Sequence, residues 1–383
     1  MTEPEVVRDP SAVSRFLDEV AMAPFLALDT ETSGLDPHAD KVLLIQFGTA
    51  DRQLLVDADA VGPAEIRAIF QPERVVVMHN ATFDLKMLWS TYGDAAGLAT
   101  ARVADTQISE QLLRNGRKSD VVMQGYGLKA LAERYAGMEL DKSIRQGFYG
   151  IRSIAELSDT ELYYAARDVE ATWKVFAQQL PELERDGLLR VAALEGAAAP
   201  AFAQLEWRGF GIDPDAWKQR IEEAKAAVDR YRKELDWELR SVADRDLFGA
   251  TTLNYDDDAE VLDALGKLGV GVGSVRRDAL EAAGHPAAAA LAGYREHRKV
   301  VSTYGEAFLA HRHATTGRLH ARFRALGAST GRTSCSDPNL QNIPSQSEFR
   351  SCFRAPDGRT LITADYSAEI GRASCRERVC HRV

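Results

Sequence analysis

The sequence predicts an α/β protein, in which a mixed sheet flanked by helices is followed by a mostly helical second half. Three observations support this fold class. Short apolar runs separated by turn residues fill residues 25–79, helical patterns follow them, and the character of the sequence changes at residues 181–186. The 383 residues are 45% hydrophobic and 27% charged, which is typical of a globular chain of two or three domains.

The predicted strands are short apolar runs, such as FLALD and KVLLIQFG, that end at turn residues. They occupy residues 25–29, 41–48, 52–56 and 74–79. Because only short turns separate the first three, we expect them to form a meander. Helical patterns occupy residues 82–89, 106–113, 127–136 and 158–179. The last helix begins after Ser158, and Glu161 follows at the spacing of a capping box.

The second half is expected to be mainly helical. An alanine-rich amphipathic stretch begins at Leu188, and helical patterns continue over residues 215–310. A strand pattern follows at 313–323, and residues 327–346 read as a loop rich in glycine, serine, proline and asparagine. Another strand is expected at 359–367.

Charge is distributed unevenly along the chain. The net charge is −10, and residues 1–190 carry all of it with 30 acidic and 20 basic residues, while the remainder has 27 of each. Charge alone therefore disfavours a nucleic-acid partner. A metal-dependent nuclease is the exception, because bound divalent ions offset clustered carboxylates.

The chain shows no sign of a membrane or an oxidising compartment. No apolar run approaches membrane-spanning length, and the N-terminal sequence MTEPEVVRDP is acidic and polar. The four cysteines lack the spacing of a zinc site. We therefore expect a cytoplasmic protein with reduced thiols and no membrane partner.

Two carboxylates follow a buried-looking strand in LALDTETSGL. Asp29 and Glu31 are two positions apart, so in a strand both side chains leave the same face. Charges at the end of an apolar strand are costly unless something compensates them. Hard divalent cations such as Mg²⁺ prefer oxygen ligands and provide that compensation.

Two further acidic residues and a tyrosine complete a candidate set. Asp84 lies in HNATFDLKML, and Tyr164 and Asp168 share a helix face in YYAARDVEAT. Taken singly, each carboxylate is more often a cap or a solvated charge. Together, four of them could bind two ions about 3.5–4 Å apart, which suits phosphodiester hydrolysis, with the tyrosine orienting the attacking water.

These segments resemble the motifs of the DEDDy 3′–5′ exonucleases, which have a ribonuclease H-like fold, and the resemblance covers about the first half of the chain. It implies that Asp29, Glu31, Asp84 and Asp168 bind two Mg²⁺ or Mn²⁺ ions and that Tyr164 positions the water. It also implies that Asn80 contacts the substrate and that Leu35 wedges against its terminal base. Asp105 is more often a structural or capping residue in this setting.

Residues 188–368 resemble the family A DNA polymerases, of the DNA polymerase I type. The match is carried by EWRGFGID, GRLHARF, STGRTSCSDPNLQNIP, FRSCFRAP and ADYS. It implies a thumb at about 215–312, which grips duplex DNA, and a partial palm whose first metal-binding aspartate is Asp365. The implied template–primer contacts are Arg332, Asn339, Gln341 and Asn342. The arginine-rich character of residues 317–368 suits phosphate contacts.

The resemblance ends inside the polymerase motif. Ile370 stands where the family has a glutamate, and neither the fingers nor the second palm aspartate follows. We therefore expect residues 369–383 to be an artefactual tail, and a C-terminally truncated chain that cannot polymerise alone. The expected domains are an exonuclease over 1–185 and part of a polymerase over 186–368.

The predicted function is two-metal removal of 3′-terminal nucleotides from DNA in replication or repair, as the proofreading part of a DNA polymerase I-type protein. The expected partners are a single-stranded 3′ end at the exonuclease and a primer–template duplex at the thumb and palm, bound by a monomer. Two alternatives stay open: a stand-alone RNA 3′ exonuclease of the ribonuclease D type, and a DNA-binding fragment without catalytic activity.

Overall fold

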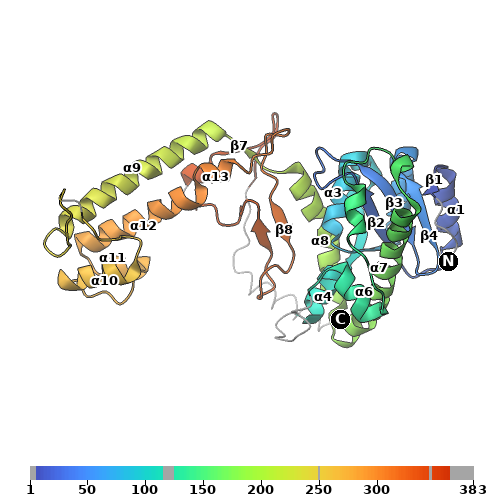
Figure 1. The fold of residues 1–383 in the computed structure, drawn as a ribbon, viewed down its shortest axis with the longest axis horizontal. Helices are drawn as coiled ribbons and strands as arrows, with labels where there is room; N and C mark the ends of the chain where they lie inside the picture. The colour runs from blue at the N-terminus through green and yellow to red at the C-terminus, as the bar shows by residue number, and fades with distance from the viewer. Residues whose placement is uncertain (1–5, 115–124, 249–250, 345–346, 363–383) are drawn as a thin grey trace, which may run out of the picture. The chain divides into compact units, whose positions relative to one another are not determined.

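The computed structural model describes residues 6–114, 125–248, 251–344 and 347–362 (Figure 1). Contacts divide them into two compact units. The first unit contains the described residues up to Gly209 together with Ala310–Ile343, and the second contains Phe210–Leu309 and the described residues from Pro344 onward. Within these residues, no helix is both long and apolar enough to cross a membrane.

The first unit is built on a six-stranded mixed sheet in the order β1-β4-β3-β2-β5-β6. Strands β2, β3 and β4 pair antiparallel as the expected meander, whereas β5 runs parallel to β2 and β6 parallel to β5. The central strands are apolar because both of their faces are covered. The bounds are Val6–Val7 (β1), Leu26–Thr32 (β2), Val42–Gly48 (β3), Gln53–Asp57 (β4), Val75–Met78 (β5) and Arg102–Asp105 (β6).

Helices cover both faces of this sheet. One face packs with α1, α2, α3 and α8 into the largest core cluster, and α7 packs against the other (Figure 1). Side chains alternate along β2, so Leu26 and Leu28 point into the first core while Asp29 and Glu31 point toward α7. The bounds are Ser11–Glu19 (α1), Pro63–Ile69 (α2), Ala81–Tyr92 (α3), Thr106–Arg114 (α4), Leu128–Ala136 (α6), Asp159–Arg185 (α7) and Leu189–Arg208 (α8).

Helix α8 belongs to the first unit although it follows the expected exonuclease domain in sequence. It packs on α3 and β6, and it approaches β6 very closely at Gly196. A Cβ atom at this position would lie 2.0 Å from the carbonyl oxygen of Val103, so only glycine fits. The expected domain boundary at residue 185 stays a prediction.

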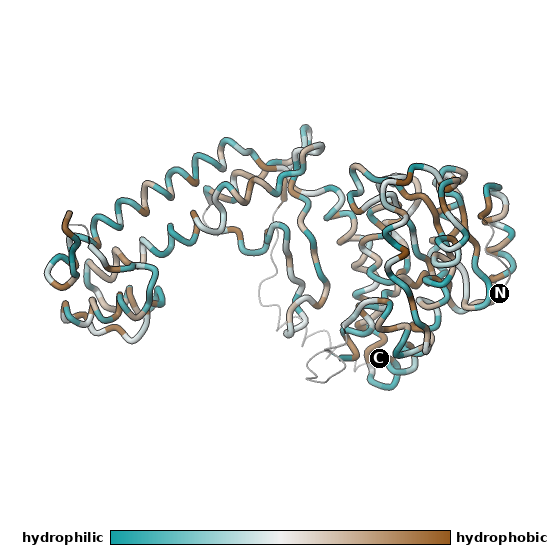
Figure 2. Tube along the Cα trace, viewed as in Figure 1, coloured by the Kyte–Doolittle hydropathy of each residue, from teal (hydrophilic) through white to brown (hydrophobic). Residues whose placement is uncertain are grey.

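The second unit is mainly helical, as predicted. Helices α9 and α12 pack along each other, and Figure 2 shows long hydrophilic stretches on α9. Trp217 is fully buried near the start of α9, where it is surrounded by the rings of Tyr304, Phe308, Phe349 and Phe353. The bounds are Pro214–Glu238 (α9), Asp258–Lys267 (α10), Arg277–Ala282 (α11), Pro286–Tyr304 (α12), Glu306–Leu309 (α13) and Ser347–Arg350 (α14).

Two pairs of short strands lie in the described part of the second half of the chain. Gly211–Ile212 (β7) pairs with Phe353–Arg354 (β10), and Arg322–Arg324 (β8) pairs with Ser334–Ser336 (β9) inside the predicted loop. The strand expected at 359–367 is wrong for residues 359–362, which have no strand structure because no strand among the described residues pairs with them. The rest of that segment lies outside the described residues, as do Asp365 and the tail at 369–383.

Candidate metal centre

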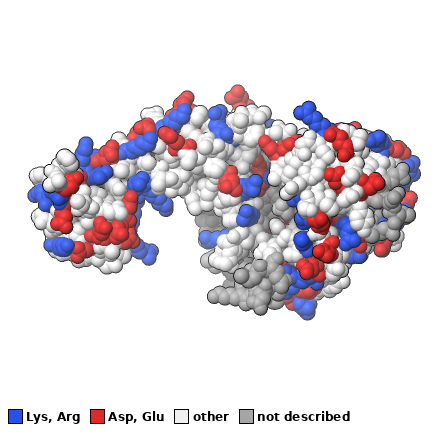
Figure 3. All heavy atoms as spheres, in the orientation of Figure 1, with Lys and Arg blue, Asp and Glu red and all other residues white. Residues whose placement is uncertain are grey.

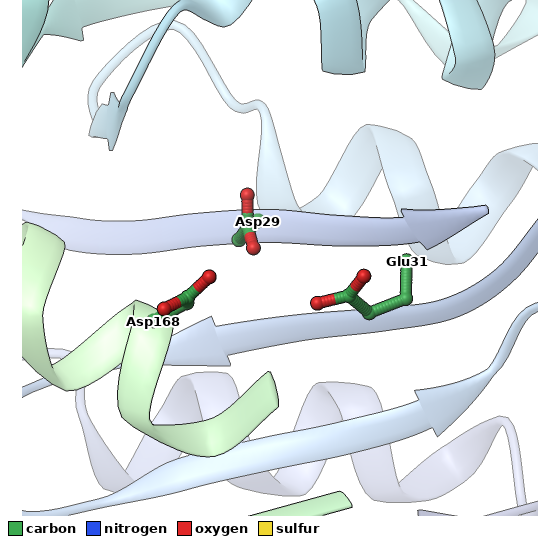
Figure 4. A group of neighbouring side chains, drawn as sticks. All are labelled: Asp29, Glu31 and Asp168. Atoms are coloured by element: carbon green, nitrogen blue, oxygen red, sulfur yellow. The ribbon is translucent and has the colours of Figure 1, made fainter. Parts of the chain in front are cut away.

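Three of the four predicted carboxylates converge on one point of the first unit. Asp29 and Glu31 come from β2 and Asp168 comes from α7, and each offers an oxygen within 4.8 Å of the others. Figure 4 shows the three carboxylates turned toward a common space between the strand and the helix. Glu31 and Asp168 are only 4% and 3% exposed. The donor set consists of oxygen alone, which suits a hard divalent cation.

Local rules of the chain place these side chains. On β3, Gln46 lies opposite Asp29, and its amide Nε2 donates to Asp29 Oδ2 at 3.2 Å. Helix α7 begins with the predicted capping box, in which Ser158 N and Oγ donate to Glu161 Oε2. Its buried residues recur at helical spacing and bring Asp168 onto the face that covers the sheet.

Asp84 does not belong to this group of three. It is buried in the first turn of α3, where its Oδ1 accepts hydrogen bonds from Thr30 N at 3.1 Å and Thr30 Oγ1 at 2.7 Å. Thr30 lies between Asp29 and Glu31, so the strand itself holds Asp84 beside the centre. Burial, followed by the charge of Asp29, raises the pKa of Asp84 well above its ordinary value.

The protein's own side chains compensate the negative charge of the centre only in part. Burial and the charge of Asp168 raise the pKa of Asp29 to about 7. Burial and the charges of Asp29 and Asp168 raise the pKa of Glu31 well above its usual range. Asp168 Oδ1 is buried and has no hydrogen-bond partner among the described residues. An orphaned carboxylate oxygen among like charges fits a divalent ion.

Two basic residues that sequence reasoning missed face this centre. Lys142 Nζ donates to Asp168 Oδ2 at 2.7 Å and to Tyr164 Oη at 2.9 Å. Arg145 interacts electrostatically with Glu31 and Asp29, and its guanidinium lies 5.7 Å from the ring centre of Phe83. Both lie in DKSIR, before the helix that carries Tyr164 and Asp168 begins. Helical periodicity therefore could not predict that they lie beside these two residues. A basic pair shortly before an acidic helix is a weak signal.

The two predicted substrate contacts lie on turns that follow the strands. Asn80 adopts a left-handed conformation with φ of 60°, which asparagine tolerates, directly before α3. Its N–H donates to Asp105 Oδ1 at 3.1 Å, and that of Ala81 donates to Asp105 Oδ2 at 2.8 Å, so Asp105 has the capping role expected for it. Leu35 is 54% exposed in the loop between β2 and β3.

The structure does not bring the predicted polymerase contacts into this centre. They are exposed on the segment 310–343, and their role as DNA contacts stays a prediction; they are Arg332, Asn339, Gln341 and Asn342. On the face drawn in Figure 3, basic and acidic side chains are interspersed rather than segregated. Charge on that face therefore does not mark a nucleic-acid surface.

Comparison with known proteins identifies both halves of the chain. A family model described as 3′–5′ exonuclease matches residues 4–184, and one described as DNA polymerase family A matches residues 258–369. DNA polymerase I of Aquifex aeolicus is 25% identical over 95% of this chain and 61% of its own length. The thermostable DNA polymerase I of Thermus filiformis is 32% identical over 51% of this chain and 24% of its own.

A solved structure has the same fold. It is the POL domain of Pol1 from M. smegmatis, in complex with a DNA primer-template and dNTP. The TM-score is 0.66 at 18% identity, over 93% of this chain and 59% of that chain. At this level of identity the likeness concerns the fold alone.

The sheet-bearing half and its acidic centre define a 3′–5′ exonuclease domain of the kind found in family A polymerases. The chain belongs to the family A DNA polymerases, of the DNA polymerase I type, as the resemblance implied. It spans about three fifths of the length of the Aquifex aeolicus relative. The exonuclease family implies the use of a divalent metal ion, and the carboxylate centre fits one.

Proposed function

We propose that the first unit is a metal-dependent 3′–5′ exonuclease that removes terminal nucleotides from DNA and releases nucleoside monophosphates. The convergence of Asp29, Glu31 and Asp168 within 4.8 Å, in the segment matched by the exonuclease family, carries this proposal. A proofreading role in a DNA polymerase I-type protein follows from the second match, over residues 258–369.

The four carboxylates are proposed to hold two Mg²⁺ or Mn²⁺ ions. Asp29, Glu31 and Asp168 would hold them directly, with Asp84 joining from α3 once its carboxylate is ionised. When bound, such ions would lower the pKa of the attacking water and offset the charge that develops on the leaving 3′-oxygen of the DNA. The protein provides fixed oxygen ligands, because β2 and α7 are both packed against the core.

Tyr164 is proposed to orient the attacking water. Burial, followed by the charge of Asp168, raises the pKa of Tyr164 above its ordinary value, so the hydroxyl stays protonated at neutral pH. Lys142 donates into the Tyr164 oxygen, which leaves the hydroxyl hydrogen to point toward an acceptor. This arrangement suits a hydrogen-bond donor to water and not a covalent nucleophile.

The substrate contacts are proposed from their positions near the centre. The exposed Leu35, four residues beyond Glu31, would pack against the terminal base, and Asn80 would contact the terminal nucleotide. The segment 310–343 would bind primer–template duplex through the four exposed contacts named above, and the second unit would grip the duplex as the thumb. Asp365 would be a metal ligand of the polymerase site.

The setting of this activity is also proposed. A DNA substrate and the free, buried thiols of Cys335 and Cys352 support a cytoplasmic location. We propose that the protein acts as a monomer. The polymerase match over residues 258–369 disfavours a stand-alone RNA exonuclease, and the intact carboxylate centre disfavours a DNA-binding fragment without activity.

The proposed function is tested with 3′-labelled single-stranded DNA and RNA of the same sequence, with Mg²⁺ or Mn²⁺. We expect DNA to be trimmed faster than RNA. The rate of DNA trimming should fall about a hundredfold or more in Asp29→Ala, because Asp29 is one of the proposed metal ligands. Asp51→Ala, at an exposed acidic residue, is the matched control. If the wild type trims DNA no faster than Asp29→Ala does, the proposed exonuclease activity is wrong. If it trims RNA faster than DNA, the RNA exonuclease is favoured.

A further inference from the structure

Three histidines gather in the first unit, away from the carboxylate centre. The ring of His38 lies 4.3 Å from that of His320 and 5.3 Å from that of His313, centre to centre, and the indole of Trp207 stacks at 6.5 Å on His38. His38 belongs to the loop between β2 and β3, whereas His313 and His320 follow more than 270 residues later. No predicted function accounts for this histidine cluster.

Hydrogen bonds fix the protonation of His320 and His38. His320 Nδ1 lies 2.8 Å from the carbonyl oxygen of Glu206, and a carbonyl oxygen only accepts, so this nitrogen carries a hydrogen. His38 Nε2 lies 3.3 Å from the same Nδ1. While His320 Nδ1 carries its hydrogen, His38 Nε2 faces that N–H as an acceptor, and a hydrogen bond to the backbone of Trp207 also holds the His38 ring.

His313 is fixed in the same way. Its Nε2 lies 2.8 Å from Asp36 Oδ2 and donates to it, while its Nδ1 accepts the backbone N–H of Thr316 at 3.2 Å. Both nitrogens of His320 are also engaged, since Nε2 bonds to Thr316 Oγ1 at 2.7 Å. The contact with His320 Nδ1 therefore favours a neutral His38, because a proton added to His38 Nε2 would place two donors against each other.

The cluster holds the loop that carries Leu35. Asp36 accepts from His313, and its Oδ1 also accepts the backbone N–H of His38 at 2.9 Å. Inside the loop, Asp40 Oδ2 accepts the N–H of Asp36 at 2.9 Å. The two residues that make these contacts to residues 313–320, Asp36 and His38, thus lie one and three positions after Leu35.

We propose that His38, His313 and His320 form a pH-sensitive positioning cluster, which fixes the Leu35 loop while the His38 ring is neutral and releases it when His38 takes up a proton. The inference rests on the proposed function, in which Leu35 packs against the terminal base. The cluster would thereby couple the grip on the DNA end to pH.

The charges around the cluster set the direction of this effect. Burial lowers the pKa of His38, Asp36 opposes this, and His313 and Lys86 on α3 lower the pKa further. Burial also lowers the pKa of His320, whose other charged neighbours are His38, His313 and Arg318. The side chain of Glu206, on α8, is itself paired with Lys86 at 2.6 Å. A lowered pKa means that the closed loop binds protons less readily than the open one, so acid below about pH 6.5 favours opening.

Hydrogen exchange of the loop at residues 33–41 tests this inference without requiring activity. We expect amide protection in the wild type to fall about tenfold or more between about pH 7.5 and about pH 5.5, after correction for the intrinsic exchange rate. His38→Gln keeps an acceptor that does not titrate, so its protection should stay nearly constant with pH. His311→Gln, at an exposed histidine two residues from His313, is the matched control and should behave as wild type.

Each result decides the question. Wild-type protection that does not change with pH, or an equal loss in His38→Gln, overturns the proposal. His38→Ala, which removes the contact at every pH, should show low protection under both conditions, and normal protection there also counts against the cluster. If the wild type fails to trim DNA, the proposed function falls, while the exchange data still decide whether the histidines hold the loop.

Discussion

Helix α7 faces two buried carboxylate sites that differ in how their charge is compensated. Toward its C-terminal end, Gln179 helps surround Glu110, which is fully buried. Glu110 also accepts from Arg114 at 3.1 Å, Arg134 at 2.5 Å and Tyr135 at 2.7 Å. Nearer its N-terminal end, Asp168 meets Asp29 and Glu31, and Lys142 is its only hydrogen-bonding cation among the described residues.

The two sites pack against the same helix, but one stabilises the fold and the other has the features of a binding site. At Glu110 the protein supplies its own cations, so the buried charge ties α4, α6 and α7 together. At the carboxylate centre the protein leaves like charges together, which costs stability unless a metal ion binds. A buried acid that is compensated serves the fold, and a group of buried acids that is not compensated indicates a binding site.

The largest expected effect is at the compensated site. Glu110→Ala should lower the free energy of unfolding by about 3–5 kcal/mol, because it removes the buried carboxylate that the largely buried Arg114 and Arg134 share. Urea unfolding followed by circular dichroism measures this. Glu133→Ala, at an exposed glutamate on α6, should change stability by less than about 0.5 kcal/mol. Equal stability of the two variants would remove the distinction between the sites.

The carboxylate centre should respond in the opposite direction. Glu31→Gln should stabilise the metal-free protein by about 2 kcal/mol while abolishing trimming, because it removes one of the mutually repelling charges. The raised pKa of Glu31 means that the folded state keeps its proton longer than the unfolded state. The advantage of the variant should therefore grow as pH rises above the ordinary glutamate pKa. Thermal unfolding in chelator at several pH values measures this, and a destabilised variant would contradict it.

The smallest effect concerns the protein's own cation at the centre. Lys142→Met should lower the turnover of DNA trimming about tenfold, because Tyr164 loses the donor that fixes its hydroxyl. Combined with Tyr164→Phe, it should cost little more than either change alone. Lys174→Met, which breaks a half-buried pair with Glu170 on α7, is the matched control. Additive losses in the double variant would show that Lys142 does not act through Tyr164.

Local rules predicted much of the fold and the candidate site. The apolar runs predicted β2 to β5 and most helices of the first unit, because strand and helix periodicity are properties of consecutive residues. Strand β6 was missed because four residues with one exposed arginine give too short a pattern. Helices α1 and α2 were missed as well, and the strand at 359–362 was wrong because a strand exists only with a partner.

The sequence by itself determined the groupings that span a few residues. Asp29 and Glu31 share a face because side chains alternate along a strand, and Tyr164 and Asp168 share one because four residues make about one helical turn. Tertiary structure alone decided which distant groups meet: Lys142 on Asp168, Thr30 on Asp84, and His38 on His320. Periodicity governs neighbours along the chain, whereas contacts between distant residues depend on how whole helices and strands pack, and no local spacing encodes that.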